Sequence, residues 1–156
     1  MDVLFASIIA VAGTLLGSTT TYVFQRLSAG HAEAFARDEQ LRQERLAAYS
    51  AFAGAITELR QGVVAVWFRQ HRDHPDPEGL YAQRVEADRR GAAADHARFR
   101  VQMLARDHDL VRLAGAVREP IDAIYEAADL PELKEHEKRC HELVKAFIAA
   151  AGDQVL

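Results

Sequence analysis

The first part of the sequence contains a long stretch without a charged residue, and this stretch limits how the chain can fold. It runs from Val3 to Phe24, which is 22 residues. As an α-helix it would extend for about 33 Å, slightly more than the roughly 30 Å hydrocarbon core of a membrane. Ser18 and the three threonines after it can hydrogen-bond to carbonyls of the preceding turn, which makes their hydroxyl groups tolerable in lipid. We therefore predict a transmembrane helix, with residues 1–27 as a membrane anchor.

A cleaved export signal and a buried helix of a soluble protein are the two alternative interpretations of this stretch. A cleaved export signal normally begins with basic residues, whereas this chain begins with Met1 and Asp2, and its uncharged run is longer than the apolar region of such a signal. A buried helix of a soluble protein is the second alternative. Burying a helix that is apolar on all sides requires more partner surface than the rest of the sequence offers. We favour the membrane span over both alternatives.

The positive charges near the predicted span indicate its orientation. No basic residue precedes it, whereas Arg26 and three further arginines up to Arg45 follow it. Positive charge flanks the cytoplasmic side of membrane helices. We therefore predict an inner (cytoplasmic) membrane protein whose N-terminus lies outside and whose residues 28–156 form a cytoplasmic body. The single cysteine, Cys140, cannot form an internal disulfide, which agrees with a reducing compartment.

Small residues recur within the predicted span at intervals of three or four. They would lie on one face of the helix, and they are Ala6, Ala10, Gly13 and Gly17. Small side chains let the backbones of two membrane helices approach closely, so this face is a candidate for helix contact and self-association. The alternative is that such residues are simply common in alanine-rich membrane helices.

The body begins with a long helical segment that carries a heptad-like apolar repeat. Residues His31 to Arg72 contain no proline, which predicts one long helix or two collinear helices. The apolar positions step by three and four residues, and they are Tyr49, Phe52, Ile56, Leu59, Val63 and Val66. This repeat makes a continuous seam against another helix. We expect these six side chains to be the seam of a helical hairpin.

A turn with helix-start signals follows the long helix. Asp76 can cap a helix and Pro77 suits its first position, so the chain should reverse here. A second arm from Pro77 to Arg118 would be as long as the first, which predicts an antiparallel hairpin. Its expected apolar positions are His96, Phe99, Met103, Leu110, Leu113 and Val117.

Two prolines divide the rest of the chain. Pro120 should end or kink the second arm and leave a short piece over residues 121–128, and Pro131 should open a last helix that ends near Ala151. The apolar face of this helix is Leu133, Cys140, Val144, Phe147 and Ile148. No segment alternates with a period of two for long enough to predict a strand. The predicted fold is all-α: a transmembrane helix, a long antiparallel hairpin and a shorter C-terminal helix in a three- to four-helix bundle.

One stretch of the body resembles a family. Residues Arg42 to Gln61 read RQERLAAYSAFAGAITELRQ. This sequence resembles uncharacterised actinobacterial single-pass membrane proteins with a charged helical cytoplasmic body. The resemblance covers the first half of the chain and implies this architecture, without an activity or a functional residue.

The sequence contains two weak candidates for a metal site, one at His71 and His74 beside the turn, where a solvated loop is the favoured interpretation, and one around the last helix. The sequence has no glycine-rich phosphate loop, no nucleophile elbow and no Cys-x-x-Cys pair. His136 and His141 are five residues apart, so they point about 140° away from each other on a helix and cannot form a zincin pair. His136 and Cys140 share a face, and His108 could supply a third ligand, where zinc requires three or four. We expect no metal, no cofactor and no enzymatic activity, with a small metal- or redox-responsive protein as the alternative.

Two adjacent aromatic residues lie near the hairpin turn. Trp67 and Phe68 either continue the hairpin core or form an exposed tip where a partner docks. We expect Trp67 and Phe68 to belong to the core, and an exposed tip is the alternative.

The charge balance and the helical architecture together predict an interaction protein. A net charge of −4 gives no general attraction to nucleic acid. A single anchor that holds a helical body is suited to self-association or to recruiting a partner. We therefore predict a membrane-anchored interaction or scaffold protein whose partners are the membrane and either further copies of itself or a membrane-associated protein.

Overall fold

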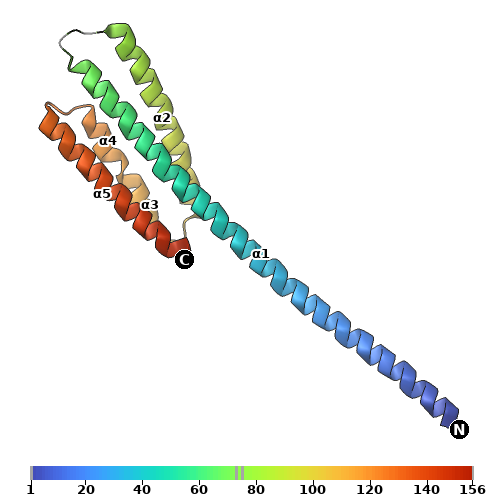
Figure 1. Ribbon diagram of the computed structural model, residues 1–156. Coiled ribbons are helices and arrows are strands. Elements are labelled where there is room, and N and C mark those ends of the chain that lie inside the picture. Colours follow the sequence, from blue (N-terminus) through green and yellow to red (C-terminus); the bar gives the residue numbers. More distant parts are fainter. Residues whose placement is uncertain (1, 73, 75, 156) are drawn as a thin grey trace. The chain divides into compact units, whose positions relative to one another are not determined.

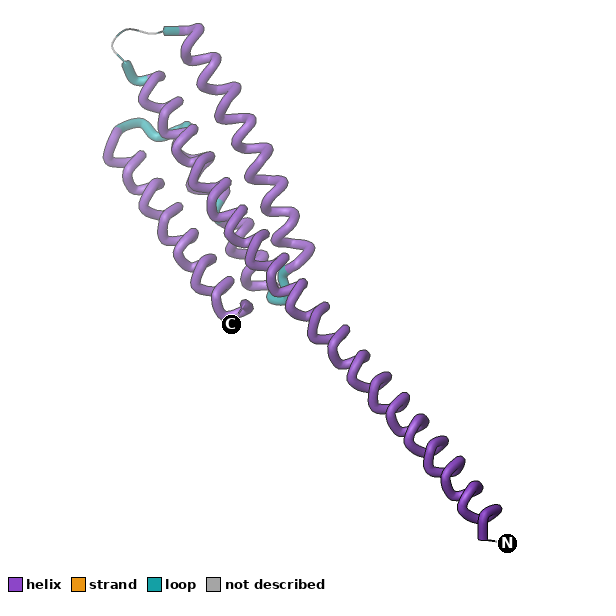
Figure 2. The backbone as a smooth tube through the Cα atoms, turned by 45° about the vertical axis from the view of Figure 1, so that its right-hand side comes forward, coloured by secondary structure: helices purple, strands orange, loops and turns teal. Residues whose placement is uncertain are grey.

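The computed structural model describes the backbone of residues 2–72, 74 and 76–155, and the side chains of residues 33, 35–72, 74 and 76–154. The chain divides into two compact units, Met1–Leu41 and Arg42–Leu156, and each is described by itself. All regular secondary structure of the described residues is α-helical, as predicted (Figure 2). The helices are α1 (Asp2–Gln70), α2 (Pro77–Leu104), α3 (His108–Ala116), α4 (Arg118–Ile124) and α5 (Leu130–Val155) (Figure 1).

The first unit consists of the N-terminal part of α1. Near its end, Phe35 is exposed and Arg37 forms an exposed ion pair with Glu33, with 3.9 Å between Nη2 and Oε2. Among the residues that the structure describes, no helix is both long enough and apolar enough to cross a membrane. The predicted span over residues 3–24 lies outside the residues whose side chains are described, and so does its small-residue face of Ala6, Ala10, Gly13 and Gly17.

The second unit is built around the C-terminal half of α1. Helices α2 and α5 lie on opposite sides of α1, and α3 and α4 pack against α5 (Figure 1). Both flanking helices run antiparallel to α1. Against α2, Arg45 Nε donates to the carbonyl of Leu104, and further along Arg90 Nη1 donates to the carbonyl of Glu58. The predicted antiparallel hairpin of α1 and α2 is therefore confirmed.

The predicted heptad seam of α1 forms the centre of the core. All six seam side chains are buried: Tyr49, Phe52, Ile56, Leu59, Val63 and Val66. The ring of Phe147 on α5 packs edge-on against Phe52, with 4.8 Å between ring centroids, and against Tyr49 at 6.1 Å. Such edge-to-face pairs stabilise the core beyond the burial of their area.

Helix α2 faces the core with small side chains. Its buried residues are Ala87, Gly91, Ala94, Ala97 and Val101. On the facing side of α1, a Cβ added at Gly62 would lie 3.2 Å from Cδ of Arg90 and 3.6 Å from Cα of Ala87. The two helices therefore approach closely at this level, because Gly62 has no side chain and the backbone of Ala87 lies opposite it.

The expected apolar face of the second arm was only partly right. Leu110 and Val117 are buried, but Phe99 is 50% exposed and Met103 is 76% exposed, and His96 is exposed as well. The alanine face of α2 packs inward, and the large side chains consequently point outward. An amphipathic pattern indicates that a helix has distinct faces, but close packing of two helices favours the face with the smaller residues.

The turn between α1 and α2 has the predicted capping. Asp76 caps α2 by accepting a hydrogen bond from the backbone N–H of Gly79 at 3.0 Å, and Pro77 occupies the first turn. Arg69 at the end of α1 pairs with the same carboxylate at 3.1 Å. A Cβ at Gly79 would displace the Arg69 guanidinium and the Asp76 carboxylate, so a side chain at this position would disturb the ion pair.

The second arm ends earlier than predicted. Helix α2 stops at Leu104 because Ala105 is extended, with ψ of 135°, and Asp107 starts α3 by accepting a hydrogen bond from the backbone N–H of Asp109 at 2.9 Å. Asp107 is a common helix-capping residue, and this signal was available in the sequence. Helix α5 also continues past the expected end at Ala151 and runs to Val155.

Trp67 connects the end of α1 to the segment between α4 and α5. Its side chain is only 5% exposed, and its indole N–H donates to the carbonyl of Ala127 at 2.7 Å. The ring of His71 stacks on it with 4.0 Å between centroids. Trp67 therefore belongs to the core, whereas its neighbour Phe68 remains exposed.

Two neighbouring residues of α5 provide a test of this packing. Phe147 is buried between Tyr49 and Phe52, whereas Ile148 is largely exposed. We expect Phe147→Ala to lower the free energy of unfolding of the body by about 3–5 kcal/mol because it leaves a cavity. Ile148→Ala should lower it by less than about 1 kcal/mol. Urea unfolding followed by the fluorescence of Trp67, the one tryptophan of the chain, measures both, and equal losses would contradict this core.

Candidate functional site

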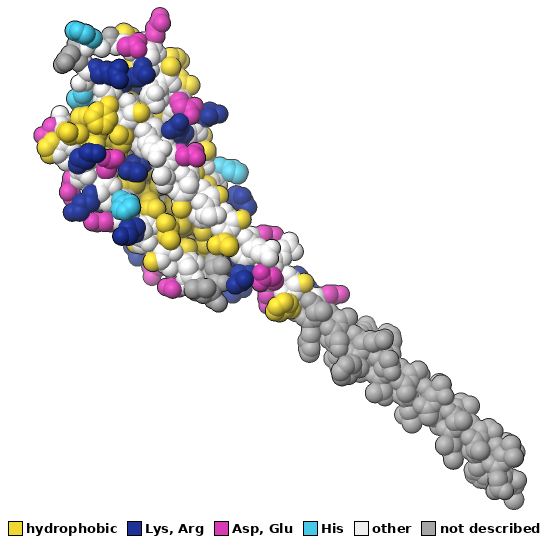
Figure 3. All heavy atoms as spheres, viewed as in Figure 1, with side chains coloured by type: hydrophobic (Ala, Val, Ile, Leu, Met, Phe, Trp, Pro, Cys, Tyr) yellow, Lys and Arg dark blue, Asp and Glu magenta, His cyan; other side chains and the backbone are white. Residues whose placement is uncertain are grey.

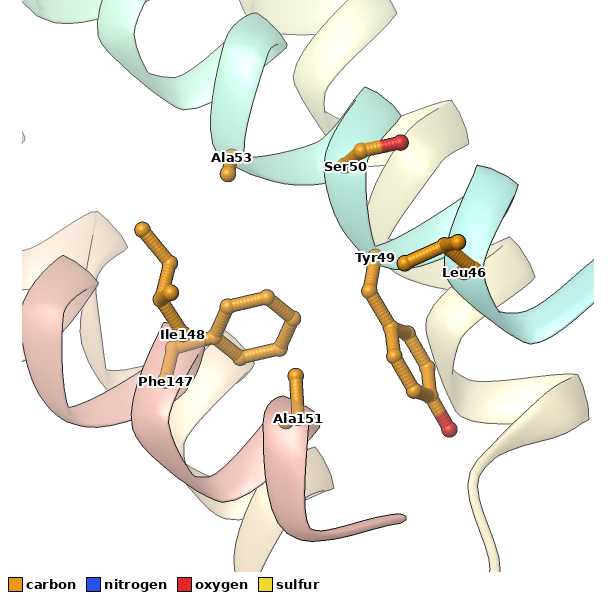
Figure 4. Close-up of a pocket in the computed structure, with 8 residues that line it drawn as sticks. Leu46, Tyr49, Ser50, Ala53, Phe147, Ile148 and Ala151 are labelled. Atoms are coloured by element: carbon orange, nitrogen blue, oxygen red, sulfur yellow. The ribbon is translucent and has the colours of Figure 1, made fainter. Parts of the chain in front are cut away.

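An open apolar groove runs between α1 and α5. We call it the α1–α5 groove, and its first hollow has a volume of about 360 Å³. Its walls are Leu46, Tyr49, Ser50 and Ala53 from α1, and Phe147, Ile148, Ala151 and Gly152 from α5 (Figure 4). Figure 3 shows hydrophobic side chains gathered along the line between these two helices. No charged residue lines this part of the groove.

The groove is open because large and small side chains alternate along its rims. Leu46 and Ile148 project from the two helices and are 55% and 53% exposed. Ser50, Ala53 and Gly152 lie next to them and leave the space that a larger side chain would fill. The Tyr49 hydroxyl donates to Oε1 of Gln154 at 3.0 Å, which joins α1 and α5 at this end. Burial raises the pKa of Tyr49 above its ordinary value, so the phenol keeps the proton that it donates.

The groove continues toward the other end of the body and becomes charged. A second hollow of about 320 Å³ shares Ile148 with the first, and its other lining residues are Ile56, Thr57, Arg60, Cys140, His141, Val144 and Lys145. Arg60 of α1 pairs with Glu137 of α5 at 3.1 Å, and Lys134 pairs with the other oxygen of that carboxylate at 2.6 Å. The α1–α5 groove therefore has an apolar end and a charged end.

The weak metal alternative is not supported by the geometry. Cys140 is buried in the core, and burial raises the pKa of its thiol to about 11, so it stays protonated near neutral pH. His136 lies 3.9 Å from the carboxylate of Glu132, and His108 is exposed at the start of α3. Among the described residues, no group of three or more His, Cys, Asp or Glu side chains could hold a metal ion. The structure therefore does not bring these three predicted ligands together.

A second apolar surface follows the outer face of α2. We call it the α2 stripe, and its members are Tyr81, Val85, Ala92, Phe99 and Met103. Tyr81 is 71% exposed, and Val85 is half exposed like Phe99. At about 100° per residue all five positions fall within roughly 40° of one another around the helix. The exposed apolar side chains therefore share one side of α2, with a large pair at each end and Ala92 between them.

Arginines border the α2 stripe. At about 100° per residue, Arg84 and Arg100 each lie roughly 80° from its centre, on opposite sides. Both are exposed. The guanidinium of Arg98 lies 4.7 Å from the ring centroid of Phe99, which is a cation–π contact. The exposed acidic residues Glu78 and Asp88 lie closer, at about 40° from the centre, so the borders carry charges of both signs. An exposed apolar line on a helix favours a helical ligand with an apolar face.

The sequence analysis did not identify either surface. It placed Phe99 and Met103 inside the bundle and Ile148 in the core face of α5, because large apolar residues at helical spacing usually point inward. The spacing of Ala87, Gly91 and Ala94 was a usable signal, because it marks a second face of α2 that permits close helix packing. Nothing in the sequence placed α1 next to α5, so the groove between them could not be derived from it.

Comparison with known proteins identifies the family. Residues 46–155 match the model of the KilB plasmid transfer protein family, and this range contains the groove, the α2 stripe and helices α2 to α5. No curated protein and no solved structure matches the chain. The stretch Arg42 to Gln61, which carried the resemblance, falls largely within the matched range. The match covers more than half of the sequence, and the chain therefore belongs to the KilB plasmid transfer protein family.

Proposed function

We propose that this chain is a membrane-anchored interaction protein of plasmid transfer. Its first helix holds the helical body at the cytoplasmic face of the inner membrane, and the body recruits a protein partner to that place. The family assignment supports the process, and the uncharged stretch of residues 3–24 supports the anchor. The arginines that follow the stretch support the orientation.

The α2 stripe is the observation that carries recruitment. A helix that only had to complete the bundle would place its large apolar side chains in the core. Helix α2 instead uses Ala87, Gly91 and Ala94 there and exposes Tyr81 and Met103 to solvent. Large exposed apolar side chains gathered on one side of a helix mark interaction sites. Covering it with a partner would remove this area from water and stabilise the complex.

The chemistry of the stripe indicates what the partner presents. From Tyr81 to Met103 the stripe is about 33 Å long, which matches six turns of a partner helix. Arg84 and Arg100 at its borders favour acidic groups on the partner, and Glu78 and Asp88 favour basic ones. The partner is therefore an amphipathic helix with charges of both signs beside its apolar face, on a protein that takes part in plasmid transfer.

The anchor and its orientation give the first prediction. A reporter that works only in the cytoplasm should be active when fused after Leu156, because the arginines after the predicted span keep the body inside. A reporter that works only outside the cytoplasm should be active when placed before Val3. Enzyme activity of both fusions in intact cells measures the topology. External activity of the Leu156 fusion would refute the orientation and the proposed location of the body.

Recruitment by the α2 stripe gives a second prediction. Val85→Asp places a negative charge in the centre of the apolar contact and should weaken partner binding about 10- to 100-fold, which corresponds to the loss of one interface hot spot. Ala82→Asp is the matched control, because Ala82 is exposed on the same helix and lies about 80° from the centre of the stripe. Plasmid transfer frequency between cells measures both variants. It should fall with Val85→Asp and stay near the wild-type value with Ala82→Asp.

The same variants need a folding control. The helical content and the Trp67 fluorescence of each purified variant should match those of the wild type, because both substituted positions are exposed. If Val85→Asp folds normally and transfers the plasmid as well as the wild type does, the α2 stripe is not the recruiting surface.

A further inference from the structure

The α1–α5 groove is complementary to itself. Its rims carry two large exposed side chains, Leu46 and Ile148, beside the small residues Ser50, Ala53 and Gly152. Leu46 and Gly152 line the same hollow, and so do Ile148 and Ala53. If α1 and α5 of a second copy cover the groove, each large side chain of one copy meets a small residue of the other copy.

The directions of the two helices define how a second pair can fit. Tyr49 of α1 contacts Gln154 of α5, and further along Arg60 contacts Glu137. Residue numbers therefore rise along α1 in the direction in which they fall along α5, so the two helices are antiparallel. Two such pairs can close into a four-helix bundle in which every neighbouring helix is antiparallel, an arrangement that helices pack into readily.

We propose that a second copy of this chain covers the α1–α5 groove, so that α1 and α5 of the two copies form a four-helix bundle with a two-fold axis parallel to α1. Each α1 then contacts α5 of the other copy. Leu46 of one copy packs over Gly152 of the other, and Ile148 packs between Ser50 and Ala53. The interface is isologous, as expected for a dimer of identical chains.

The uneven polarity of the groove selects this axis. A two-fold axis parallel to α1 places the apolar end of one groove on the apolar end of the other. An axis perpendicular to α1 would place the apolar end around Leu46 against the charged end, where Arg60, His141 and Lys145 lie. That alternative would take charged groups out of water against apolar side chains, which is unfavourable.

The charged end is complementary under the same axis. Arg60 and Glu137 lie at the same level of the bundle, as their 3.1 Å contact shows. The two-fold axis places Arg60 of each copy between its own Glu137 and Glu137 of the other copy. Positive and negative side chains then alternate around the bundle, and each charge has two opposite neighbours.

This dimer deepens the proposed function and rests on it in one respect. Because the axis is parallel to α1, the two α1 helices run in the same direction, as two chains anchored in one membrane require. The α2 stripe takes no part in the contact, so each copy keeps its surface for the recruited partner. A dimer with two recruiting surfaces would bind a repetitive partner more strongly through multivalency.

The dimer is tested with the full-length chain purified in detergent, by measuring its mass by light scattering. The wild type should have the mass of two copies. Ile148→Asp should raise the dissociation constant at least about 100-fold and give one copy, because it places an unpaired charge in the apolar contact. Ala149→Asp, on the adjacent exposed residue at about 100° from Ile148, should leave two copies.

Disulfide crosslinking tests the direction of the axis in membranes. Copies with Leu46→Cys and differently tagged copies with Gly152→Cys should form a disulfide when expressed together, and a Cβ at Gly152 meets no atom within 4 Å. Copies with Leu46→Cys and His141→Cys should not, because only the perpendicular axis brings these positions together. The native Cys140 is buried and stays in place. A disulfide of the second pair without the first would overturn the proposed geometry.

Two further variants separate this dimer from other contacts. Gly17→Ile blocks the small-residue face of the predicted anchor, and Val85→Asp blocks the α2 stripe. Both should leave the mass at two copies. If Gly17→Ile or Val85→Asp gives the mass of one copy while Ile148→Asp still gives two, the copies meet elsewhere and the groove proposal is wrong. The proposal is also wrong if the wild type is a monomer. Loss of plasmid transfer by Val85→Asp with an intact dimer would support recruitment independently of this result.

Discussion

The apolar seam of α1 is the surface on which the rest of the body depends. Its six residues are buried, and all but Val66 belong to one core cluster that takes side chains from each of the other helices of the second unit. The shorter helices contribute Leu110 from α3 and Ile124 from α4, and α5 contributes Leu133 and Phe147. Hydrophobic burial along a single helix therefore joins α2, α3, α4 and α5 in one core.

Close packing on one side of α1 has a consequence on the outside of the molecule. Because Gly62 of α1 faces Ala87 of α2, the alanine face of α2 fits against α1 and its large residues point away. On the other side, Phe147 fills the space beside Tyr49 and Phe52, and Ile148 on the adjoining face stays exposed. Each apolar surface of the body arises because a neighbouring face of the same helix is used for the core.

These surfaces suit a protein that acts by contact. The chain belongs to the KilB plasmid transfer protein family, and the proposed activity in that process is recruitment at a membrane. The α1–α5 groove is lined by α1 and α5 and the α2 stripe lies on α2, so one can join two copies while the other binds a partner. The charged borders of each surface would set the direction of the contact and exclude ligands of the wrong charge.

The sequence by itself determined the elements of this protein. The steps of three and four from Tyr49 to Val66 identified the buried seam, and Asp76 with Pro77 identified the reversal of the chain, because both signals are local properties of a helix. The end of α2 at Leu104 was missed, although the capping residue Asp107 is visible in the sequence. Leu133, Cys140 and Phe147 of the predicted face of α5 are buried, as expected. Only the tertiary structure decided which face of α2 is buried, that Ile148 stays exposed and that α5 lies beside α1. All three depend on how closely helices distant in sequence can approach, and a single helix carries no record of the shape of its neighbour.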